Sequence, residues 1–312
     1  MRKSQPLIGV CIPTFNDGNY LFESVESILN QTYKNFVIYI LNDGSEIKWH
    51  NLYKKVFSNN KKIIYSYQKN LGIVKCSQKL LEICKKNRKV KFIARMDGDD
   101  ISDPKRFEYQ VDLIFRKKLD LVGCHFKRMN RVKKVFEKNL APLNNIHFFL
   151  HLLTGSPFAH GSIIFKKDIL KKGINYLQTN FRHTIFPEDY NFYLKCFYNQ
   201  IKIGAVNKFL YFHRYHSNSY SMQNRLIYNY SLKKNRYLFF LNNFLILNNL
   251  IKEKFLFNNL YIEIILIKII LIYKFELNYK IIVNIFSSIK IYDYFLILKY
   301  FFIRKIKKFI YG

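Results

Sequence analysis

Short apolar runs separated by polar turns mark the N-terminal third of the chain. The run Leu7–Ile12 ends at Pro13 and has the unbroken apolar character of a strand that is buried on both faces. Similar runs at Phe36–Leu41, Ile63–Tyr67 and Lys91–Met96 predict three further strands. The pattern therefore predicts a largely buried sheet.

Between these predicted strands the apolar positions change to helical spacing. Asn16 or Asp17 can cap a helix with an apolar face, and that face comprises Leu21, Val25, Ile28 and Leu29. A second helix is expected near Ile73–Lys86. Alternation of strand and helix predicts an α/β fold with a doubly wound, mostly parallel central sheet flanked by helices. Ligands of such sheets bind beyond the carboxyl ends of the strands.

The later part of the chain begins with two helical segments. The helix that follows Pro104 has an apolar face formed by Phe107, Val111, Ile114 and Phe115. The helix Glu188–Tyr198 has one formed by Tyr190, Tyr193, Leu194 and Phe197. A last strand is expected at Leu210–His213, and from about Ser221 the pattern becomes helical and basic. We therefore predict a catalytic-type α/β domain over residues 1–220 and a mainly helical region over residues 221–312.

The charge of the chain is strongly positive. Its 312 residues include 52 Lys and Arg against 21 Asp and Glu, a formal net charge of +31. The 49% hydrophobic content excludes a disordered chain despite that charge. A basic chain is attracted to nucleic acids and to anionic membranes. Ile, Lys, Asn, Phe and Tyr have AT-rich codons, so part of the charge can instead reflect the base composition of the gene.

Cysteine usage and targeting signals point to the cytoplasm. The five cysteines include no C-x-x-C pair, which is typical of a reducing compartment rather than of a disulfide or zinc framework. The apolar run at the N-terminus is too short for a signal peptide, and no uninterrupted stretch of ~20 apolar residues predicts a membrane span.

The end of the chain, Tyr294–Tyr311, predicts a basic amphipathic helix. Its apolar stripe comprises Phe295, Leu298, Phe302, Ile306 and Phe309. Such a helix can lie on the cytoplasmic face of an anionic membrane, which would make the protein peripheral, or it can pack on the catalytic domain with a solvated basic face.

The sequence lacks three common nucleotide or acyl-transfer motifs, namely G-x-G-x-x-G after the first strand, a P-loop and a G-x-S-x-G elbow. It has instead an acidic cluster directly after the strand Lys91–Met96, formed by Asp97, Asp99 and Asp100. Three carboxylates in four residues repel one another unless a cation neutralises them, and such oxygens suit Mg²⁺ or Mn²⁺. The alternative is a solvated acidic turn ahead of the next helix.

Three further segments carry polar groups at element ends. The turn Asn42–Ser45 follows a strand and is also an ordinary strand-to-helix turn. Glu188 and Asp189 begin a helix, where acidic residues complement the helix dipole, although both lie in an otherwise basic stretch. Phe212–His216 follows the last strand with cationic or metal-binding groups.

The order and spacing of these segments closely resemble family 2 glycosyltransferases of the GT-A fold. The resemblance covers roughly residues 6–220. It rests on Ile8–Asn16, Ser27–Tyr33, Asn42–Ser45, Asn70–Gly72, Asp97–Asp100 with Pro104 and Arg106, His160–Ser162, Glu188–Tyr190 and Arg214–His216.

The resemblance implies a role for each matching residue on the donor side. The base of a nucleotide-sugar would lie against Pro13, Phe15 and Asp43. The family's D-x-D motif corresponds to Asp97, which would approach the ribose or the metal, and Asp99, which would bind the metal on the diphosphate; Asp100 shares either task. The turn reads Asn42-Asp43 where the family usually has two acids, and Phe15 stands where Tyr is common.

The resemblance also implies the catalytic and acceptor side. The family's base corresponds to Asp189, and His216 corresponds to a position near the diphosphate or the metal. His160, Glu188 and Arg214 are assigned to the acceptor or diphosphate side.

The implied function is an inverting glycosyltransferase with an Mn²⁺ or Mg²⁺ cofactor. It would move a sugar from a nucleotide-diphosphate sugar to a hydroxyl of a glycan or lipid-linked glycan, as in envelope polysaccharide or lipopolysaccharide synthesis. Two alternatives remain open at this stage. A nucleotidyltransferase also uses carboxylate-bound metal, but has no need for the late Glu188-Asp189 pair. A basic nucleic-acid-binding protein fits the charge, but no recognised nucleic-acid motif is present and we expect no such partner.

Overall fold

The computed structural model describes residues 5–177 and 188–216, together with 219, 222 and 236. The chain divides into two units, residues 1–149 with 156–232 and residues 150–155 with 233–312, and the site described below belongs to the first. The amphipathic segment Tyr294–Tyr311 lies outside the described residues. The division into 1–220 and 221–312 therefore stays a prediction. No helix in the described ranges combines the length and apolar character that a membrane crossing requires.

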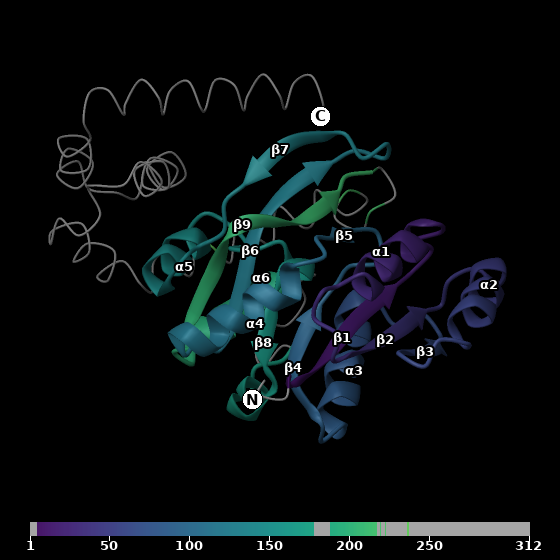
Figure 1. The fold of residues 1–312 in the computed structure, drawn as a ribbon, viewed down its shortest axis with the longest axis horizontal. Helices are drawn as coiled ribbons and strands as arrows, with labels where there is room; N and C mark the ends of the chain where they lie inside the picture. Colours follow the sequence, from purple (N-terminus) through teal and green to yellow (C-terminus); the bar gives the residue numbers. More distant parts are fainter. Residues whose placement is uncertain (1–4, 178–187, 217–218, 220–221, 223–235, 237–312) are drawn as a thin grey trace, which may run out of the picture. The chain divides into compact units, whose positions relative to one another are not determined.

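Within the described residues, nine strands form one sheet in the order β3-β2-β1-β4-β8-β6-β9-β5, with β7 paired to β6 (Figure 1). The strands are β1 Leu7–Thr14, β2 Phe36–Asp43, β3 Ile63–Gln68, β4 Val90–Arg95, β5 Ile101–Ser102, β6 Leu121–Met129, β7 Val135–Asn139, β8 Ile164–Lys166 and β9 Ile203–Arg214.

The first four strands in that order are parallel, as predicted. Strand β1 pairs with β2 on one side, Thr14 opposite Asn42, and with β4 on the other, Cys11 opposite Arg95. Because parallel strands end at the same edge, this register brings the segments after β1, β2 and β4 together. The apolar runs of the sequence thus place the predicted ligand-binding turns side by side.

The other half of the sheet is mixed. Strand β8 is antiparallel to both β4 and β6, while β6 and β9 run parallel and β5 is antiparallel to β9. Strand β9 is longer than the predicted strand Leu210–His213. Its pairing with β6 continues beyond the strand, because the Tyr215 N–H donates to the Met129 carbonyl at 2.8 Å. This extension carries His216 to the edge where β4 ends.

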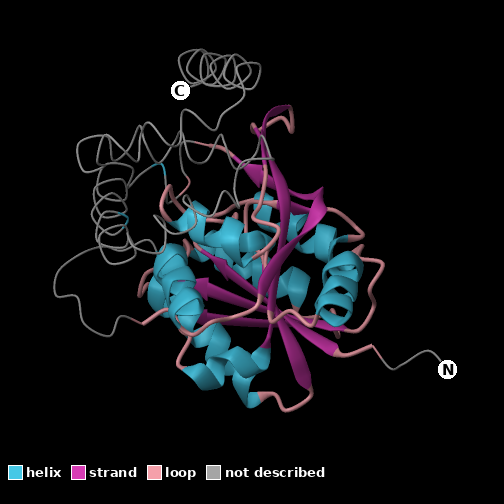
Figure 2. Cartoon of the chain, turned by 90° about the vertical axis from the view of Figure 1, so that its left-hand side faces the viewer, coloured by secondary structure: helices cyan, strands magenta, loops and turns pink. Residues whose placement is uncertain are grey.

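Helices lie on both sides of the strands (Figure 2). They are α1 Tyr20–Leu29, α2 Ile47–Phe57, α3 Ile73–Lys86, α4 Arg106–Lys117, α5 Asn145–Leu152 and α6 Glu188–Tyr198, with 3₁₀ turns η1 His160–Ser162 and η2 Lys167–Lys172. Helix α2 is an element that the sequence pattern did not predict.

Strand β1 is covered on both faces, which explains its unbroken apolar run. Ile8, Val10 and Ile12 belong to the core cluster that includes residues of α1 and α4. On the opposite face the Cys11 Sγ lies 3.3 Å from the Cys84 Sγ of α3. The five cysteines are free and buried. The predicted doubly wound α/β architecture is confirmed.

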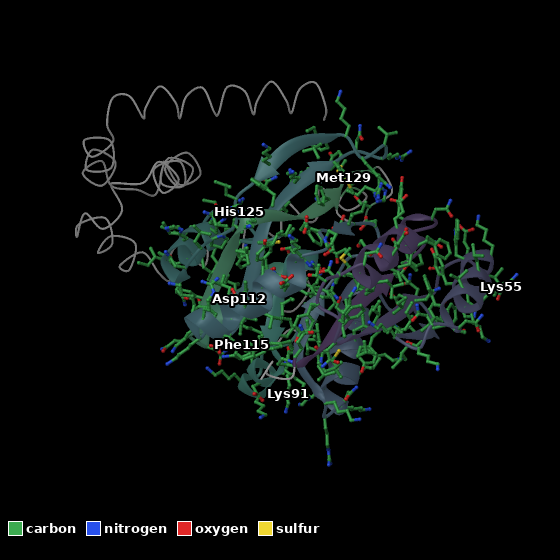
Figure 3. The ribbon with its side chains drawn as sticks, in the orientation of Figure 1. Lys55, Lys91, Asp112, Phe115, His125 and Met129 are labelled. Atoms are coloured by element: carbon green, nitrogen blue, oxygen red, sulfur yellow. The ribbon has the colours of Figure 1, made fainter. Side chains whose placement is uncertain are left out.

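Three local predictions were wrong. Helix α1 is flanked by Asn19 rather than capped by Asn16 or Asp17, because Asn16 has a positive φ of 56° and bonds the next loop instead. On α4, Phe115 is 57% exposed and lies at the edge of the buried stripe (Figure 3). On α6 the predicted residues Tyr190 and Tyr193 are buried, but Leu194 and Phe197 are only partly buried, so that part of the predicted face was wrong. The buried face comprises Tyr190, Phe192, Tyr193 and Cys196.

Candidate active site

The turn after β4 brings several carboxyl groups together at the end of the sheet. Asp97 and Asp99 are partly exposed, whereas Asp100 is fully buried. Gly98 lies between them without a side chain, and a Cβ there would overlap the Asp17 carboxylate that comes from the segment after β1. The missing side chain of Gly98 therefore lets a fourth carboxyl reach the cluster.

Crowding raises the pKa of three of these carboxyl groups. Burial is the first cause of the raised pKa of Asp17, Asp97 and Asp100, and the charge of Asp99 raises each of them further. Arg95 offsets part of the shift in the pKa of Asp97. The ionised form of these carboxyl groups is thus disfavoured in the protein alone, and a bound cation would favour it.

Asp99 is held from two sides by the segment at the end of β9. Its Oδ2 lies 2.8 Å from the His216 Nε2. Its backbone carbonyl accepts a hydrogen bond from the Arg214 Nε at 2.7 Å. The two residues that the sequence assigned to the diphosphate or metal side therefore lie against the D-x-D turn.

The Arg214 guanidinium is engaged by the protein itself. Besides Asp99, it donates to the Arg131 carbonyl at 3.2 Å and to Glu23 Oε2 at 2.6 Å. Its backbone N–H donates to the buried Asp100 at 2.7 Å. With every guanidinium nitrogen bonded to protein, Arg214 is placed to position the acidic turn.

Helix α6 brings its acidic N-terminus to the same place. Burial and then the charge of Asp189 raise the pKa of Glu188 to about 8. Asp189 also contributes to the raised pKa of Asp97, which places the start of α6 near the turn after β4. The Asp189 Oδ1 accepts the Tyr190 N–H at 2.6 Å. Residues far apart in the sequence are thus brought within electrostatic reach.

His160 lies beneath this edge between two tyrosines. Its Nδ1 is 2.9 Å from the Tyr193 hydroxyl and its Nε2 is 2.6 Å from the Tyr176 hydroxyl. Burial, and then the charge of Arg95, hold its pKa well below the usual value, so the ring is neutral. His160 was assigned to the acceptor side, and in this structure both of its ring nitrogens are occupied by protein partners.

The residues predicted to bind the nucleobase lie at the ends of β1 and β2. Pro13 is buried in β1, and Phe15 follows that strand with half of its surface exposed. Asp43 ends β2 and accepts hydrogen bonds from the Gln68 amide at 2.6 Å and from the backbone N–H groups of Leu71 and Gly72. The carboxylate of Asp43 is therefore fixed, with an exposed aromatic ring beside its strand.

Hydrogen bonds connect the loop after β1 with the loop after β2. The Asn16 N–H donates to Ser45 Oγ, and the Glu46 N–H donates to Asn16 Oδ1, each at 2.9 Å. The motif Asn42–Ser45 is thus more than a turn, since it fixes the segment that carries Phe15.

The carboxylate oxygens of the acidic turn suit a divalent cation as ligands. Among the residues with described positions, no three carboxyl, imidazole or thiol groups form a complete metal site by themselves. Mg²⁺ and related ions nevertheless bind through one or two carboxylates and complete their shell with water and substrate phosphates. The partly exposed Asp99, next to His216 and near the other carboxyl groups of the cluster, meets that requirement.

Two residues at this site were missed by the sequence pattern. Asp17 was considered only as a possible helix cap, and no motif indicated that Gly98 leaves room for it. Arg95 stands two positions before Asp97, and the sequence assigned it no role. It is 1% exposed, and its Nη2 lies 3.4 Å from Asp97 Oδ1. A basic residue at a buried strand end was the available signal.

Comparison with known proteins identifies the family of the chain. The family model described as "Glycosyl transferase family 2" matches residues 9–174. An uncharacterized glycosyltransferase of Methanocaldococcus jannaschii is 32% identical over 215 residues, which are 66% of this chain and 70% of that protein. The Escherichia coli O-antigen biosynthesis glycosyltransferase WbnJ is 29% identical over 202 residues, 61% of this chain and 71% of the relative. Other relatives are longer, and the match spans 34–59% of their length.

Solved structures share the fold at low identity. Staphylococcus aureus TarS 1–349 in complex with UDP-GlcNAc has a TM-score of 0.58 and 16% identity, covering 90% of this chain and 79% of that one. The mannosyltransferase PcManGT from Pyrobaculum calidifontis, in complex with GDP-Man and Mn²⁺, has a TM-score of 0.52 and 12% identity, covering 71% and 61%. The predicted GT-A fold is thereby confirmed.

Proposed function

The chain belongs to glycosyl transferase family 2, and we propose that it transfers a sugar, with inversion, from a nucleotide-diphosphate sugar to a hydroxyl acceptor. The observation that carries the proposal is the meeting of two acidic groups at one sheet edge. The turn after β4 supplies Asp97 and Asp99, and α6 supplies Asp189, whose charge acts on Asp97. A donor held by the first group would present its sugar to the second.

In this proposal the nucleobase of the nucleotide-sugar lies against Pro13, Phe15 and Asp43. The exposed Phe15 ring offers a face for stacking, and the fixed Asp43 offers acceptor oxygens to the base. Asp97 approaches the ribose, and Asp100 supports the turn from its buried position. The complexes of TarS with UDP-GlcNAc and of PcManGT with GDP-Man support a donor of this class.

Asp99 and His216 would hold Mn²⁺ or Mg²⁺, with Asp97 as a further ligand. Such an ion stabilises the charge that develops on the departing diphosphate. Arg214 keeps Asp99 in place through the Asp99 carbonyl, which makes it a positioning residue for this group. The presence of Mn²⁺ beside GDP-Man in the PcManGT complex supports a divalent cation here.

Asp189 acts as the general base. The acceptor hydroxyl attacks the anomeric carbon from the face opposite the diphosphate, the bond to the diphosphate oxygen breaks, and the hydroxyl proton passes to the Asp189 carboxylate. One in-line displacement inverts the anomeric configuration. The dipole at the N-terminus of α6 favours the ionised form of a carboxyl at that position, as a base requires. Glu188, with its pKa raised to about 8, carries a proton at neutral pH and can bond an acceptor oxygen.

We further propose an acceptor on an envelope glycan or a lipid-linked precursor, with the protein in the cytoplasm or peripheral on the cytoplasmic face of the membrane. The O-antigen biosynthesis role named for WbnJ supports a glycan acceptor. The basic amphipathic segment Tyr294–Tyr311 supports an anionic surface as a partner. His160, behind Glu188 and Asp189, would support the acceptor side through Tyr176 and Tyr193.

Replacing the proposed base tests this function directly. The variant Asp189→Asn should keep its affinity for the donor and lose transfer activity by about 10²–10⁴-fold, because the amide cannot take the hydroxyl proton. Activity is measured by release of nucleoside diphosphate across a panel of nucleotide-sugars and acceptors, and affinity by calorimetry.

A surface acid provides the matched control for this variant. Asp168 in η2 pairs with Lys171, and its side chain is 74% exposed. Asp168→Asn should transfer sugar at the wild-type rate. Full activity in Asp189→Asn, or loss of nucleotide binding together with transfer, would show that Asp189 is not the base.

A further inference from the structure

Arg95 is a buried arginine whose backbone is fixed at the floor of the site. It ends β4, two positions before Asp97, and only 1% of its surface is exposed. Its backbone N–H donates to the Ile163 carbonyl at 3.0 Å, and its own carbonyl accepts from the Arg106 Nη2 at 3.2 Å. The end of β4 therefore fixes the backbone position from which the Arg95 side chain extends.

The Arg95 guanidinium has unused hydrogen-bond donors. Among the residues that the structure describes, its one hydrogen bond is the 3.4 Å contact from Nη2 to Asp97 Oδ1, and Nε and Nη1 have no acceptor. A buried donor without an acceptor carries a desolvation cost that no protein contact offsets. Arg214 is equally buried, yet its three guanidinium nitrogens each donate to a protein oxygen. The two arginines differ in their use of donors, not in burial.

Arg95 lies near residues that were assigned to the sugar-donor side and near residues that were assigned to the acceptor side of the proposed site. Its Cζ lies 5.7 Å from the ring centroid of Tyr176, and its charge acts on Asp97 and on Glu188 at the start of α6. An arginine guanidinium is not deprotonated in proteins. The guanidinium remains charged between the two acidic groups that the proposed reaction brings together.

We propose that Arg95 is a specificity-determining residue, and that its unused Nε and Nη1 groups bind oxygen acceptors on the transferred sugar. The inference rests on the proposed function and names the chemistry of the subsite. The ligand groups are oxygen acceptors, since a guanidinium only donates hydrogen bonds. Neutral hydroxyl or acyl oxygens are favoured over a sugar carboxylate because Asp97 already places negative charge beside the guanidinium.

The variant Arg95→Met tests the assignment through a ratio of affinities. Calorimetry compares the nucleotide-sugar that the wild type hydrolyses fastest, among UDP-glucose, UDP-galactose, UDP-GlcNAc and GDP-mannose, with the matching UDP or GDP. Affinity for the nucleotide-sugar should fall about tenfold to hundredfold, as expected for loss of hydrogen bonds from a charged donor. Affinity for UDP or GDP alone should fall much less, through the loss of the contact with Asp97. An equal change for both ligands, or no change, would overturn the assignment.

Deoxy and deoxyfluoro forms of the same donor separate direct contact from an effect transmitted by Asp97. The wild type should lose affinity when the bonded oxygen is absent, and Arg95→Met should be insensitive to that change. Arg95→Lys, which keeps the charge and loses the planar fork, should give an intermediate ratio. If Arg95→Met stays as sensitive as the wild type, Arg95 does not contact the sugar.

Thermal unfolding without ligand distinguishes this role from a purely structural one. Arg95→Met removes unpaired buried donors, so its melting temperature should equal or exceed that of the wild type. Arg106→Met is the matched control, because the Arg106 Nη groups donate to the Gly161 and Arg95 carbonyls, and it should melt lower. A similar loss in Arg95→Met would assign Arg95 to folding. A wild type that binds no nucleotide or nucleotide-sugar would instead refute the proposed function.

Discussion

Burial and neighbouring charge give single carboxyl groups at this site distinct properties. Glu188 and Asp189 are adjacent in the sequence, and the pKa of Glu188 rises to about 8 from burial first and then from Asp189. One acid of the pair is therefore protonated at neutral pH. The sequence shows two acidic residues at a helix start. Only their environment distinguishes Glu188, which is protonated, from Asp189, the proposed general base.

The raised pKa of Glu188 predicts a pH dependence of stability. Its pKa is 4.5 in the unfolded chain and about 8 in the folded one, so the folded state binds the proton more strongly. The stabilising contribution is complete below pH 4.5 and is lost as pH rises through 8, by at most about 1.4 kcal/mol per pH unit. Glu188→Gln is neutral throughout, so its melting temperature should gain on the wild type between pH 5 and pH 9.

The control for this measurement is Glu82→Gln on the exposed side of α3, which should follow the wild type at every pH. Parallel melting curves for Glu188→Gln and the wild type across this range would rule out the raised pKa.

Among the elements, the turn between β2 and α2 shows how local geometry supports the proposed donor pocket. Gly44 has a φ of +83°, and a Cβ there would lie 2.6 Å from the backbone nitrogen of Asn70. The Asn70–Gly72 segment is the one that donates two backbone N–H groups to Asp43. The turn thus needs glycine for its backbone angle and for the close approach of a second loop.

Gly44→Ala should destabilise the fold and weaken nucleotide binding. The backbone strain alone costs about 1–2 kcal/mol, and the overlap with Asn70 adds to it and displaces Asp43. Gly173→Ala separates the two effects, because Gly173 has a φ of +76° with nothing within 4 Å of its Cβ position. Urea unfolding and UDP titration measure both variants. Equal losses of stability in the two, with unchanged UDP affinity for Gly44→Ala, would contradict the argument.

Across the whole molecule, the excess of basic residues and the cluster of acidic residues have different consequences. The net charge of +31 favours association with anions in general. A small group of acids lies at one sheet edge, with Asp17 after β1, Asp97–Asp100 after β4 and Glu188 and Asp189 at the start of α6. Burial first, and then neighbouring negative charge, raises the pKa of Asp17, Asp97 and Asp100. In the proposed function the positive background aids association with diphosphates and anionic surfaces, and the clustered acids carry the chemistry.

The basic segment at the end of the chain predicts membrane association. The full-length protein should bind vesicles that contain anionic lipid at physiological salt, and replacement of Arg304, Lys305, Lys307 and Lys308 by Gln should weaken binding by about 1 kcal/mol per charge. Vesicle sedimentation measures this, with neutral vesicles as the control. If the wild type and the variant bind anionic vesicles equally, the segment does not contact the membrane.

Periodicity determined the elements whose burial is simple. Helix α3 and helix α6 have the predicted bounds, and the four parallel strands lie where the apolar runs predicted them. Strands β1 and β2 are buried along almost their whole length, which excludes polar side chains from most positions. Strand β3 lies at the edge of the sheet and is partly exposed. The mixed half of the sheet was not predictable in the same way. Strand β8 has three residues and β5 has two, and such short segments have no period of their own.

The sequence by itself determined the family, the parallel half of the sheet and the acidic motifs, because these depend on local composition and order. Only the tertiary structure decided how those groups act. It placed Asp17 against Gly98, turned the Arg214 guanidinium onto the carbonyl of Asp99, and left two Arg95 nitrogens without acceptors. Partners that are distant in the chain have no sequence spacing to reveal them, and the desolvation that sets their charge exists only after the chain has folded.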